Sequence, residues 1–286
     1  MLQQSRMGWA VGTLLLAAFL AVSPRPARAA AEEAPAAVDL AWGLKIPLRD
    51  GVVLNATVYR PAGQREPLPV VFTLTPYIGD SYHERGLYFA RHGYVFVLVD
   101  ARGRGSSGGR FNPFAQEAQD GYDTVEFLAR QPWANGKVAM WGGSYAGYDQ
   151  WATLKAAPPH LATIVPAAPV HPGLDFPLQG GIPASYTIQW LTYTAGATNN
   201  KNLFGEFSFW TQKFLDMYRR QTPFASLDSQ VGNPSPVFQE WLAHPAYDAY
   251  WQAMSPTPAE YRRIAAPILT ITGHYDADQI GALSFY

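Results

Sequence analysis

At positions 138–147 the chain reads Val-Ala-Met-Trp-Gly-Gly-Ser-Tyr-Ala-Gly, an apolar run that leads into a serine among small residues. Val138 to Trp141 is predicted to be a strand, and the pattern from Tyr145 to about Ala157 predicts a helix. A strand, a tight turn of small residues and a helix that begins at a serine form the context of a nucleophile elbow. Small residues are needed there because the serine is strained and the strand and helix must approach closely. Ser144 is therefore the candidate nucleophile.

The elbow fits the usual G-x-S-x-G pattern only loosely, because Ala146 stands at the second small position and the glycine follows as Gly147. A glycine-serine turn without a chemical role is the alternative interpretation. The position of the turn, after an apolar strand and within a β-α series, favours the nucleophile. The helix that follows also directs free backbone N–H groups toward the serine, where they can hold a developing oxyanion.

Strands and helices alternate on both sides of this stretch. Leu68 to Leu74 and Tyr94 to Val99 are near-continuous apolar runs, as expected for parallel strands that are covered on both faces. The segment between them, Ser81 to His92, has helical spacing and is followed by the stop signal Gly93. Repeated β-α-β units predict an α/β fold with a mostly parallel, doubly wound sheet. The other expected elements are hairpin strands over 44–48 and 52–59, a helix over about 116–129, and strands over about 162–166 and 267–272.

From about residue 170 to 265 the alternation breaks into aromatic segments that are punctuated by proline, and we expect a helical cap that is inserted between strands. Residues 38–286 are expected to form the catalytic domain. Before it, Arg6 precedes an uncharged, mostly apolar run, and the small-residue stretch of residues 27–29 follows that run. This pattern predicts a signal peptide over residues 1–29 and a secreted or periplasmic protein. An uncleaved membrane anchor is the alternative, but the run is shorter than the roughly 20 residues that a spanning helix needs.

The composition excludes several classes of partner and cofactor. A formal net charge of -1 gives no global field that would attract nucleic acid or anionic lipid. The absence of cysteine excludes a disulfide framework, a thiolate metal site and a cysteine nucleophile. No group of histidines and carboxylates has the spacing of metal ligands. We therefore expect no metal, no cofactor, no nucleic-acid partner and no membrane contact beyond the signal peptide.

The elbow from Gly142 to Gly147 resembles the G-x-S-Y-x-G box of the CocE/NonD hydrolases. That family contains cocaine-esterase-like enzymes and X-prolyl dipeptidyl-peptidase-like serine peptidases, and it implies the α/β-hydrolase fold. The likeness runs from about Leu44 to the end, and further motifs agree in order. They are Thr75-Pro76-Tyr77, the D-x-R-G-x-G-x-S loop of residues 100–109 with Asp100 and Arg102 as expected braces, the lead-in over 131–138, and Gly273-His274-Tyr275-Asp276 as the G-W-Y-D acid motif.

The resemblance implies roles for four residues. Ser144 attacks the carbonyl carbon, and the backbone N–H of Tyr145 and the phenol of Tyr77 hold the oxyanion. Asp276 orients and stabilises the catalytic imidazolium from the loop after its strand. The alternatives are a packed aromatic in an ordinary Pro-Tyr turn for Tyr77, and a helix N-cap at Asp276 or Asp278.

The catalytic base is missing from these motifs. In this fold the triad runs serine, acid, histidine along the chain, so the base is expected after Asp276, where no histidine follows. His171 and His274 could contact a substrate, although a packing or surface position is favoured for each. We therefore expect the histidine beyond Tyr286, with further strands and a β-rich domain of the family, and the chain to be a fragment or a truncated product.

Two hypotheses about function follow. The first is a serine hydrolase that cleaves a small ester, amide or short peptide through an acyl-enzyme on Ser144, as an acyl esterase or an X-prolyl dipeptidyl-peptidase-like enzyme. The second is a secreted, inactive binding protein that keeps the scaffold but lacks the histidine. Aromatic residues of the cap suit either an apolar acyl group or the core of the cap itself: Trp190, Tyr193, Phe207, Trp210 and Trp241. Recognition of a free α-amino group would need carboxylates from the cap, where Glu206, Asp216, Asp228 and Glu240 are available.

Overall fold

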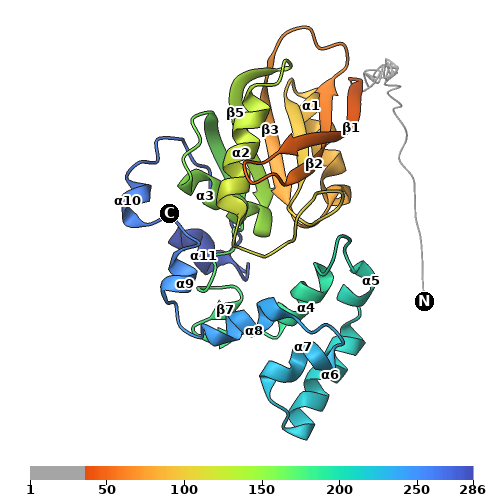
Figure 1. The fold of residues 1–286 in the computed structure, drawn as a ribbon, viewed down its shortest axis with the longest axis vertical. Helices are drawn as coiled ribbons and strands as arrows, with labels where there is room; N and C mark the ends of the chain where they lie inside the picture. The colour runs from red at the N-terminus through yellow and green to blue at the C-terminus, as the bar shows by residue number, and fades with distance from the viewer. Residues whose placement is uncertain (1–35, 286) are drawn as a thin grey trace, which may run out of the picture. The chain divides into compact units, whose positions relative to one another are not determined.

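The structure is a computed structural model that describes residues 36–285. The predicted signal peptide of residues 1–29 lies outside the described residues. A six-stranded sheet in the order β1-β2-β4-β3-β5-β6 forms the centre of the described part (Figure 1). The first two strands are antiparallel to their neighbours, and the other contacts in the sheet are parallel, as the sequence predicts. The strands are β1 (Val38–Pro47), β2 (Val53–Pro61), β3 (Leu68–Thr75), β4 (Val95–Asp100), β5 (Ala134–Gly143) and β6 (Leu161–Ala167).

Helices cover both faces of this sheet, and the pattern of β4 explains why. Successive side chains of a strand point to opposite faces. Val95, Val97 and Val99 belong to the larger apolar cluster, on the face that α2 (Glu117–Ala129) and α3 (Tyr145–Lys155) cover. Phe96 and Leu98 belong to the other cluster, on the face of α1 (His83–Arg91). The whole of β4 is buried, so its near-continuous apolar run is what a strand between two helical layers requires.

The hairpin that opens the sheet forms where the sequence predicts it. Gly51 has φ +86°, a conformation that glycine adopts without steric cost. The turn is closed by two hydrogen bonds, from Leu48 N–H to Val52 O at 2.8 Å and from Gly51 N–H to Leu48 O at 3.0 Å. From this turn β1 forms the edge of the sheet, and β2 lies between β1 and β4.

The strand that was predicted over 267–272 is only partly formed. Ile268 and Ile271 make isolated parallel bridges to Ile164 and Ala167 at the end of β6. The segment therefore pairs on one side with β6, but no strand borders its other side in the part of the chain that the structure describes. Side chains that a neighbouring element would cover are accordingly half exposed, such as Leu269 at 59%. The apolar run therefore pairs with β6 through two isolated bridges and does not form a continuous strand.

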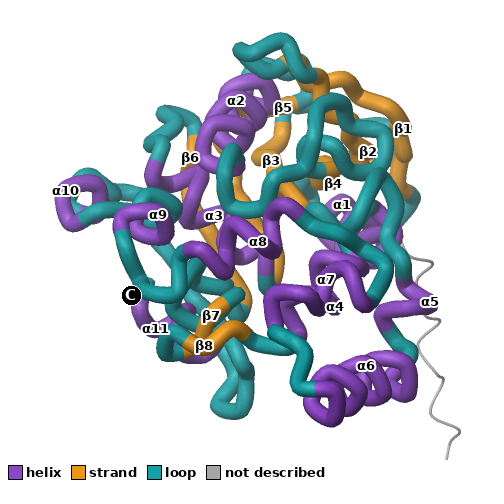
Figure 2. The backbone as a smooth tube through the Cα atoms, turned by 60° about the horizontal axis from the view of Figure 1, so that its bottom comes forward, coloured by secondary structure: helices purple, strands orange, loops and turns teal. Residues whose placement is uncertain are grey.

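Between β6 and this segment lies a mostly helical region, which Figure 2 shows below the sheet. Its core contains buried aromatic side chains, among them Trp210, Phe238 and Trp241. No helix within residues 36–285 combines the length and the apolar character that crossing a bilayer requires. The helices are α4 (Tyr186–Tyr193), α5 (Lys201–Phe204), α6 (Phe207–Arg220), α7 (Leu227–Gln230), α8 (Pro236–Ala243), α9 (Ala249–Gln252) and α10 (Pro258–Tyr261), and a short hairpin of β7 (Leu178–Gln179) and β8 (Ile182–Pro183) precedes them.

Candidate active site

The turn between β5 and α3 holds Ser144 in a strained conformation, with φ 57° and ψ -123°. Its N–H donates to Ala167 O at 2.9 Å, which fixes the turn against the end of β6. A Cβ atom on Gly142 would lie 2.8 Å from the Cβ of Ala146, so the alanine of this elbow fits because position 142 is glycine. A Cβ on Gly147 would lie 2.9 Å from the Cα of Pro169. The displaced glycine is therefore required by the loop that follows β6.

Tyr77 lies directly beside the serine. Its phenolic oxygen is 3.3 Å from Ser144 Oγ, and it accepts a hydrogen bond of 3.2 Å from the indole Nε1–H of Trp190. The contact follows from topology, because β3 and β5 are parallel neighbours whose carboxyl ends meet at one edge of the sheet. Burial raises the pKa of Tyr77 above its ordinary value, and hydrogen bonds with Ser144 and Trp190 offset only part of this effect. The phenol therefore stays protonated near neutral pH and can donate.

The backbone and side chain of Tyr145 have different roles. Its N–H is the first of α3, so helix geometry gives it no intrahelical acceptor. The side chain points into the core, where its hydroxyl donates to Glu117 and accepts from Phe114 N–H at 2.8 Å. Burial raises the pKa of Glu117 to about 7. The side chain thus anchors the start of α3, and no acceptor for the N–H is recorded within residues 36–285.

A hollow of about 290 Å³ opens beside Ser144. Helix α4 presents Tyr186 and Trp190 to it, four residues apart and hence on one face of the helix. The spacing of these two aromatics was a signal in the sequence that could have identified Tyr186 as a site residue. The lining consists of Tyr77, Ser144, Tyr145, Val170, Asp175, Phe176, Gln179, Ala184, Tyr186, Trp190, Ala277 and Asp278.

The predicted acid Asp276 is exposed and does not line this hollow. Its Oδ1 accepts from the N–H of Asp278 at 2.9 Å, just before α11 (Gln279–Ser284). Asp278 does line the hollow, and burial, with Asp175 and Asp276 nearby, raises its pKa to about 7. Asp278 is also the N-cap residue of α11, although its side chain makes no capping hydrogen bond. The structure therefore brings Ser144, Tyr77 and Tyr145 together, and the role of Asp276 stays a prediction.

Asp175 is a buried carboxylate that the sequence analysis did not identify. Its oxygens accept from His171 N–H at 2.8 Å and from Gly281 N–H at 2.6 Å, so it ties the loop after β6 to α11. Burial raises its pKa to about 6. The contact with Gly281 joins residues more than a hundred positions apart, so no local sequence pattern predicts it.

The two candidate histidines, His171 and His274, lie outside the hollow. His171 is buried, its ring lies 4.4 Å from that of Phe285, and burial lowers its pKa. His274 is exposed next to Gln279. Neither lines the space beside Ser144. Within residues 36–285, no three histidines or carboxylates are grouped so that they could hold a metal ion.

The carboxylates and aromatic residues that the sequence offers in the cap differ in whether they line the hollow. None of the four carboxylates lines it: Glu206, Asp216, Asp228 and Glu240. Of the five aromatics, Trp190 lines it, and Tyr193 packs against Tyr77 with ring centroids 6.0 Å apart. Trp210 and Trp241 are buried in the core, whereas Phe207 is 78% exposed.

The loop after β4 is braced as expected. Arg102 forms ion pairs with Asp120 at 2.5 Å and with Asp50 at 2.6 Å. The backbone oxygen of Asp100 accepts from Ser107 Oγ at 2.7 Å. Both contacts hold the shape of the loop, and neither residue lines the hollow beside Ser144.

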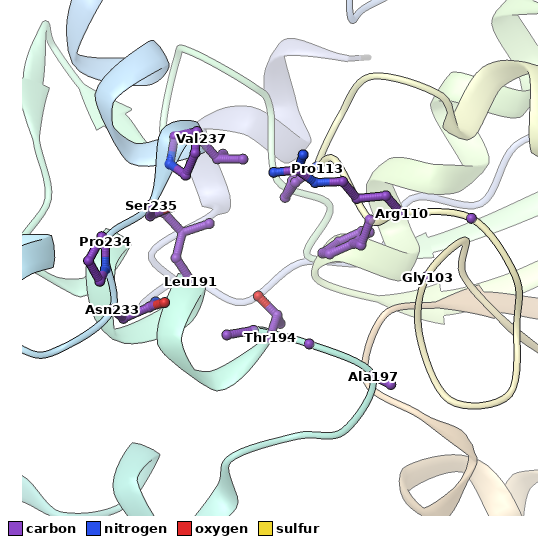
Figure 3. A pocket seen from close by; sticks show the side chains of 15 residues that line it. Gly103, Arg110, Pro113, Leu191, Thr194, Ala197, Asn233, Pro234, Ser235 and Val237 are labelled. Carbon is purple, nitrogen blue, oxygen red and sulfur yellow. The ribbon is translucent and has the colours of Figure 1, made fainter.

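Another hollow, of about 350 Å³, lies between this loop and the cap, with Arg110 and Leu191 among its lining residues (Figure 3). Phe111 lines this hollow, and its ring lies 5.7 Å from that of Tyr145 and 6.3 Å from that of Trp190, which both line the first hollow. The serine in its wall, Ser235, accepts from Phe238 N–H and caps α8. This hollow holds no strained nucleophile, so the chemistry points to the hollow beside Ser144.

The chain is similar to several known proteins. Residues 50–286 match the sequence profile of the X-Pro dipeptidyl-peptidase (S15) family. The cocaine esterase of Rhodococcus sp. is 34% identical over 134 residues, which cover 45% of this chain and 23% of the esterase.

Two solved structures share the fold. An aminopeptidase from the marine sediment archaeon Thaumarchaeota archaeon has a TM-score of 0.69 at 23% identity, over 87% of this chain and 46% of its own. An alpha-amino acid ester hydrolase has a TM-score of 0.67 at 22% identity, over 93% of this chain and 48% of its own. The predicted α/β-hydrolase fold is confirmed. The chain spans about half the length of these two structures and about a quarter of the esterase.

Proposed function

The chain belongs to the X-Pro dipeptidyl-peptidase (S15) family, and from this premise we propose that it is a serine hydrolase that forms an acyl-enzyme on Ser144. The resemblance to the CocE/NonD hydrolases is confirmed, and it supports cleavage of ester or peptide bonds. The observation that carries the proposal is the strained Ser144, with the protonated phenol of Tyr77 3.3 Å from its Oγ and a hollow of about 290 Å³ beside both.

The proposed reaction has two halves. Ser144 Oγ attacks the carbonyl carbon while a general base takes its proton, and the carbonyl oxygen becomes an oxyanion. Tyr145 N–H and Tyr77 O–H donate to that oxygen. The bond to the leaving group then breaks, the leaving alcohol or amine takes the proton from the base, and the acyl group stays on Ser144. Water attacks the acyl-enzyme in the same manner and releases the acid.

The base is a separate part of the proposal. We propose that it is a histidine and that Asp276 orients it, as the acid of a triad does. An exposed Asp276 is compatible with this role, because the acid of a triad contacts the imidazole and not the serine. Asp276→Asn should therefore lower kcat, and an unchanged kcat would contradict this role of Asp276.

One observation favours a substrate with an amino-acyl group as a second candidate. Asp278 lies in the wall of the hollow, and no hydrogen bond of its carboxylate is recorded among the described residues. A cationic amine that binds beside Ser144 would pair with it and would lower its raised pKa. The comparison of an acyl ester with the matching α-amino-acyl ester tests this idea. Preference for the amine, lost in Asp278→Asn, supports it, and equal kcat/KM values would contradict it.

The experiment that tests the proposal is steady-state hydrolysis of p-nitrophenyl esters and aminoacyl p-nitroanilides by the full-length gene product. We expect Ser144→Ala to lower kcat by about 10⁴-fold or more, as loss of a nucleophile does in serine hydrolases. The same variant should keep nearly all of its melting temperature, because the side chain of Ser144 loses a single long hydrogen bond, the 3.3 Å contact with Tyr77. A folded full-length protein without activity on either substrate class would favour the inactive binding protein.

We also propose that the protein acts outside the cytoplasm, on the basis of its N-terminal pattern alone. Sequencing the N-terminus of the mature protein tests this. A start near Ala30 in the periplasmic or secreted fraction is the expected result, and an intact Met1 in the cytoplasm would contradict it.

A further inference from the structure

We propose that Trp190, which the cap contributes, is a positioning residue of the oxyanion site: its indole N–H holds the Tyr77 hydroxyl so that the phenolic proton points toward Ser144. This inference rests on the proposed function. It assigns to a cap residue a part in the chemistry, whereas an aromatic side chain in the wall of a hollow would ordinarily be taken as a surface for the acyl group.

The first argument is the direction of the hydrogen bonds. An indole N–H can only donate, so the phenolic oxygen must be the acceptor in the 3.2 Å contact between Trp190 and Tyr77. The hydroxyl has a single proton, which is therefore turned away from the indole. The other recorded contact of this hydroxyl is Ser144 Oγ at 3.3 Å, and the proton has an acceptor there. The proton thus points toward Ser144, beside which the oxyanion would form.

The second argument is that the indole cannot easily turn away. Trp190 is only 4% exposed. Its ring stacks on Tyr145 with centroids 5.5 Å apart and 19° between the planes, and Phe176 packs edge-on at 5.4 Å. The ring of Trp241 lies behind it at 6.4 Å. Because Tyr145 begins α3, the same stack joins the indole to the other oxyanion donor.

The third argument is that the cap and the loop after β4 together hold the backbone of the oxyanion loop. Asn199 of the cap donates from Nδ2 to Tyr77 O, and the buried Arg104 of the loop after β4 donates from Nε to Pro76 O at 2.9 Å. Arg104 also donates to Asn199 Oδ1, so the two side chains are joined to each other. Hydrogen bonds thus hold both the backbone and the hydroxyl of Tyr77. Donors that are oriented before the reaction stabilise a developing charge without reorganisation.

A double-mutant cycle in the full-length protein tests this role. Removal of one oxyanion donor typically costs about 10²–10³ in kcat, and we expect that range for Tyr77→Phe. Trp190→Phe should lower kcat by about tenfold with a smaller change in KM, and by less than about twofold when Phe already replaces Tyr77, because coupled residues are not additive. Equal losses in both backgrounds would mean that Trp190 only lines the hollow, and the inference would be wrong.

Trp241→Phe is the matched control, because Trp241 packs against Trp190 but makes no recorded contact with Tyr77. Its effect should be the same in both backgrounds. A different result would contradict the proposed function itself, namely full activity of the Ser144→Ala variant.

A second measurement needs no turnover. In a ¹⁵N-edited spectrum the indole N–H signal of Trp190 is the one that Trp190→Phe removes. We expect Tyr77→Phe to shift this signal upfield, because the hydrogen-bond acceptor is lost. A signal that does not move would contradict the geometry on which the inference rests.

Discussion

The two halves of the candidate site differ in what holds them. Ser144 and Tyr77 follow β5 and β3, and parallel pairing of adjacent strands sets their distance. Trp190 and Tyr186 come from α4, which reaches the site through packed aromatic side chains. Backbone geometry thus fixes the sheet half, and packing fixes the cap half. The difference teaches that changes in the sheet half should act on the chemistry, and that changes in the cap half, with the exception of Trp190, should act on substrate fit or on stability.

The largest expected effect compares one tyrosine from each half. Tyr77→Phe should lower kcat by about 10²–10³ with little change in KM, because it removes a donor to the oxyanion. Tyr186→Ala should raise KM several-fold and leave kcat nearly unchanged, because Tyr186 only lines the hollow from the cap. Steady-state kinetics of the full-length protein measure both. A fall in kcat of similar size for both variants would remove the distinction between the halves.

The next comparison lies within the cap. Trp210 is 2% exposed and Phe207 is 78% exposed, although the sequence presents them as similar aromatics on α6. Trp210→Ala should lower the free energy of unfolding by about 3–5 kcal/mol. Phe207→Ala should change it by less than about 0.5 kcal/mol. Urea denaturation measures the free energy of unfolding of both variants. Similar losses of stability would contradict the packing of the cap that is described above.

A smaller effect tests the elbow itself. Gly142→Ala places a Cβ 2.8 Å from that of Ala146, and such overpacking costs about 1–3 kcal/mol. The second substitution Ala146→Gly removes the clash and should restore part of the stability and of kcat. Thermal unfolding and kinetics of the single and double variants measure this. If the double variant is no better than the single one, the contact with Ala146 is not the cause.

The smallest effect concerns the carboxylate of Asp278. Its pKa is raised to about 7, so the folded state binds the proton more tightly than the unfolded state does. The stability from this group is complete below the ordinary pKa of about 4 and is lost as the pH rises through about 7. The melting temperature of Asp278→Asn should therefore fall less between pH 5 and pH 8 than the melting temperature of the unchanged protein does. Parallel slopes would contradict the raised pKa.

The sequence predicts the sheet half of the site better than the cap half. The buried run of β4 and the small residues around Ser144 predict the sheet and the elbow, because local backbone requirements leave a local pattern. The cap leaves only a weaker pattern, the four-residue spacing of Tyr186 and Trp190. A Trp in a core and a Trp beside a substrate are chosen for the same apolar surface. Trp190 and Trp210 are therefore not separable before their neighbours are known.

The acid side of the site shows the same limit. The family resemblance points to Asp276, whereas the structure places Asp278 in the wall of the hollow. Which of these two carboxylates lines the hollow depends on how α11 is held. One contact that holds it joins Asp175 and Gly281, which lie far apart in sequence. Contacts of this kind have no local signature.

The central claim is that Ser144 is the nucleophile. The most direct measurement is labelling of the folded full-length protein with a fluorophosphonate probe, followed by peptide mapping. We expect one adduct on Ser144 and no labelling of the Ser144→Ala variant. Absence of labelling in the folded protein, or an adduct on another serine that persists in that variant, would contradict the claim.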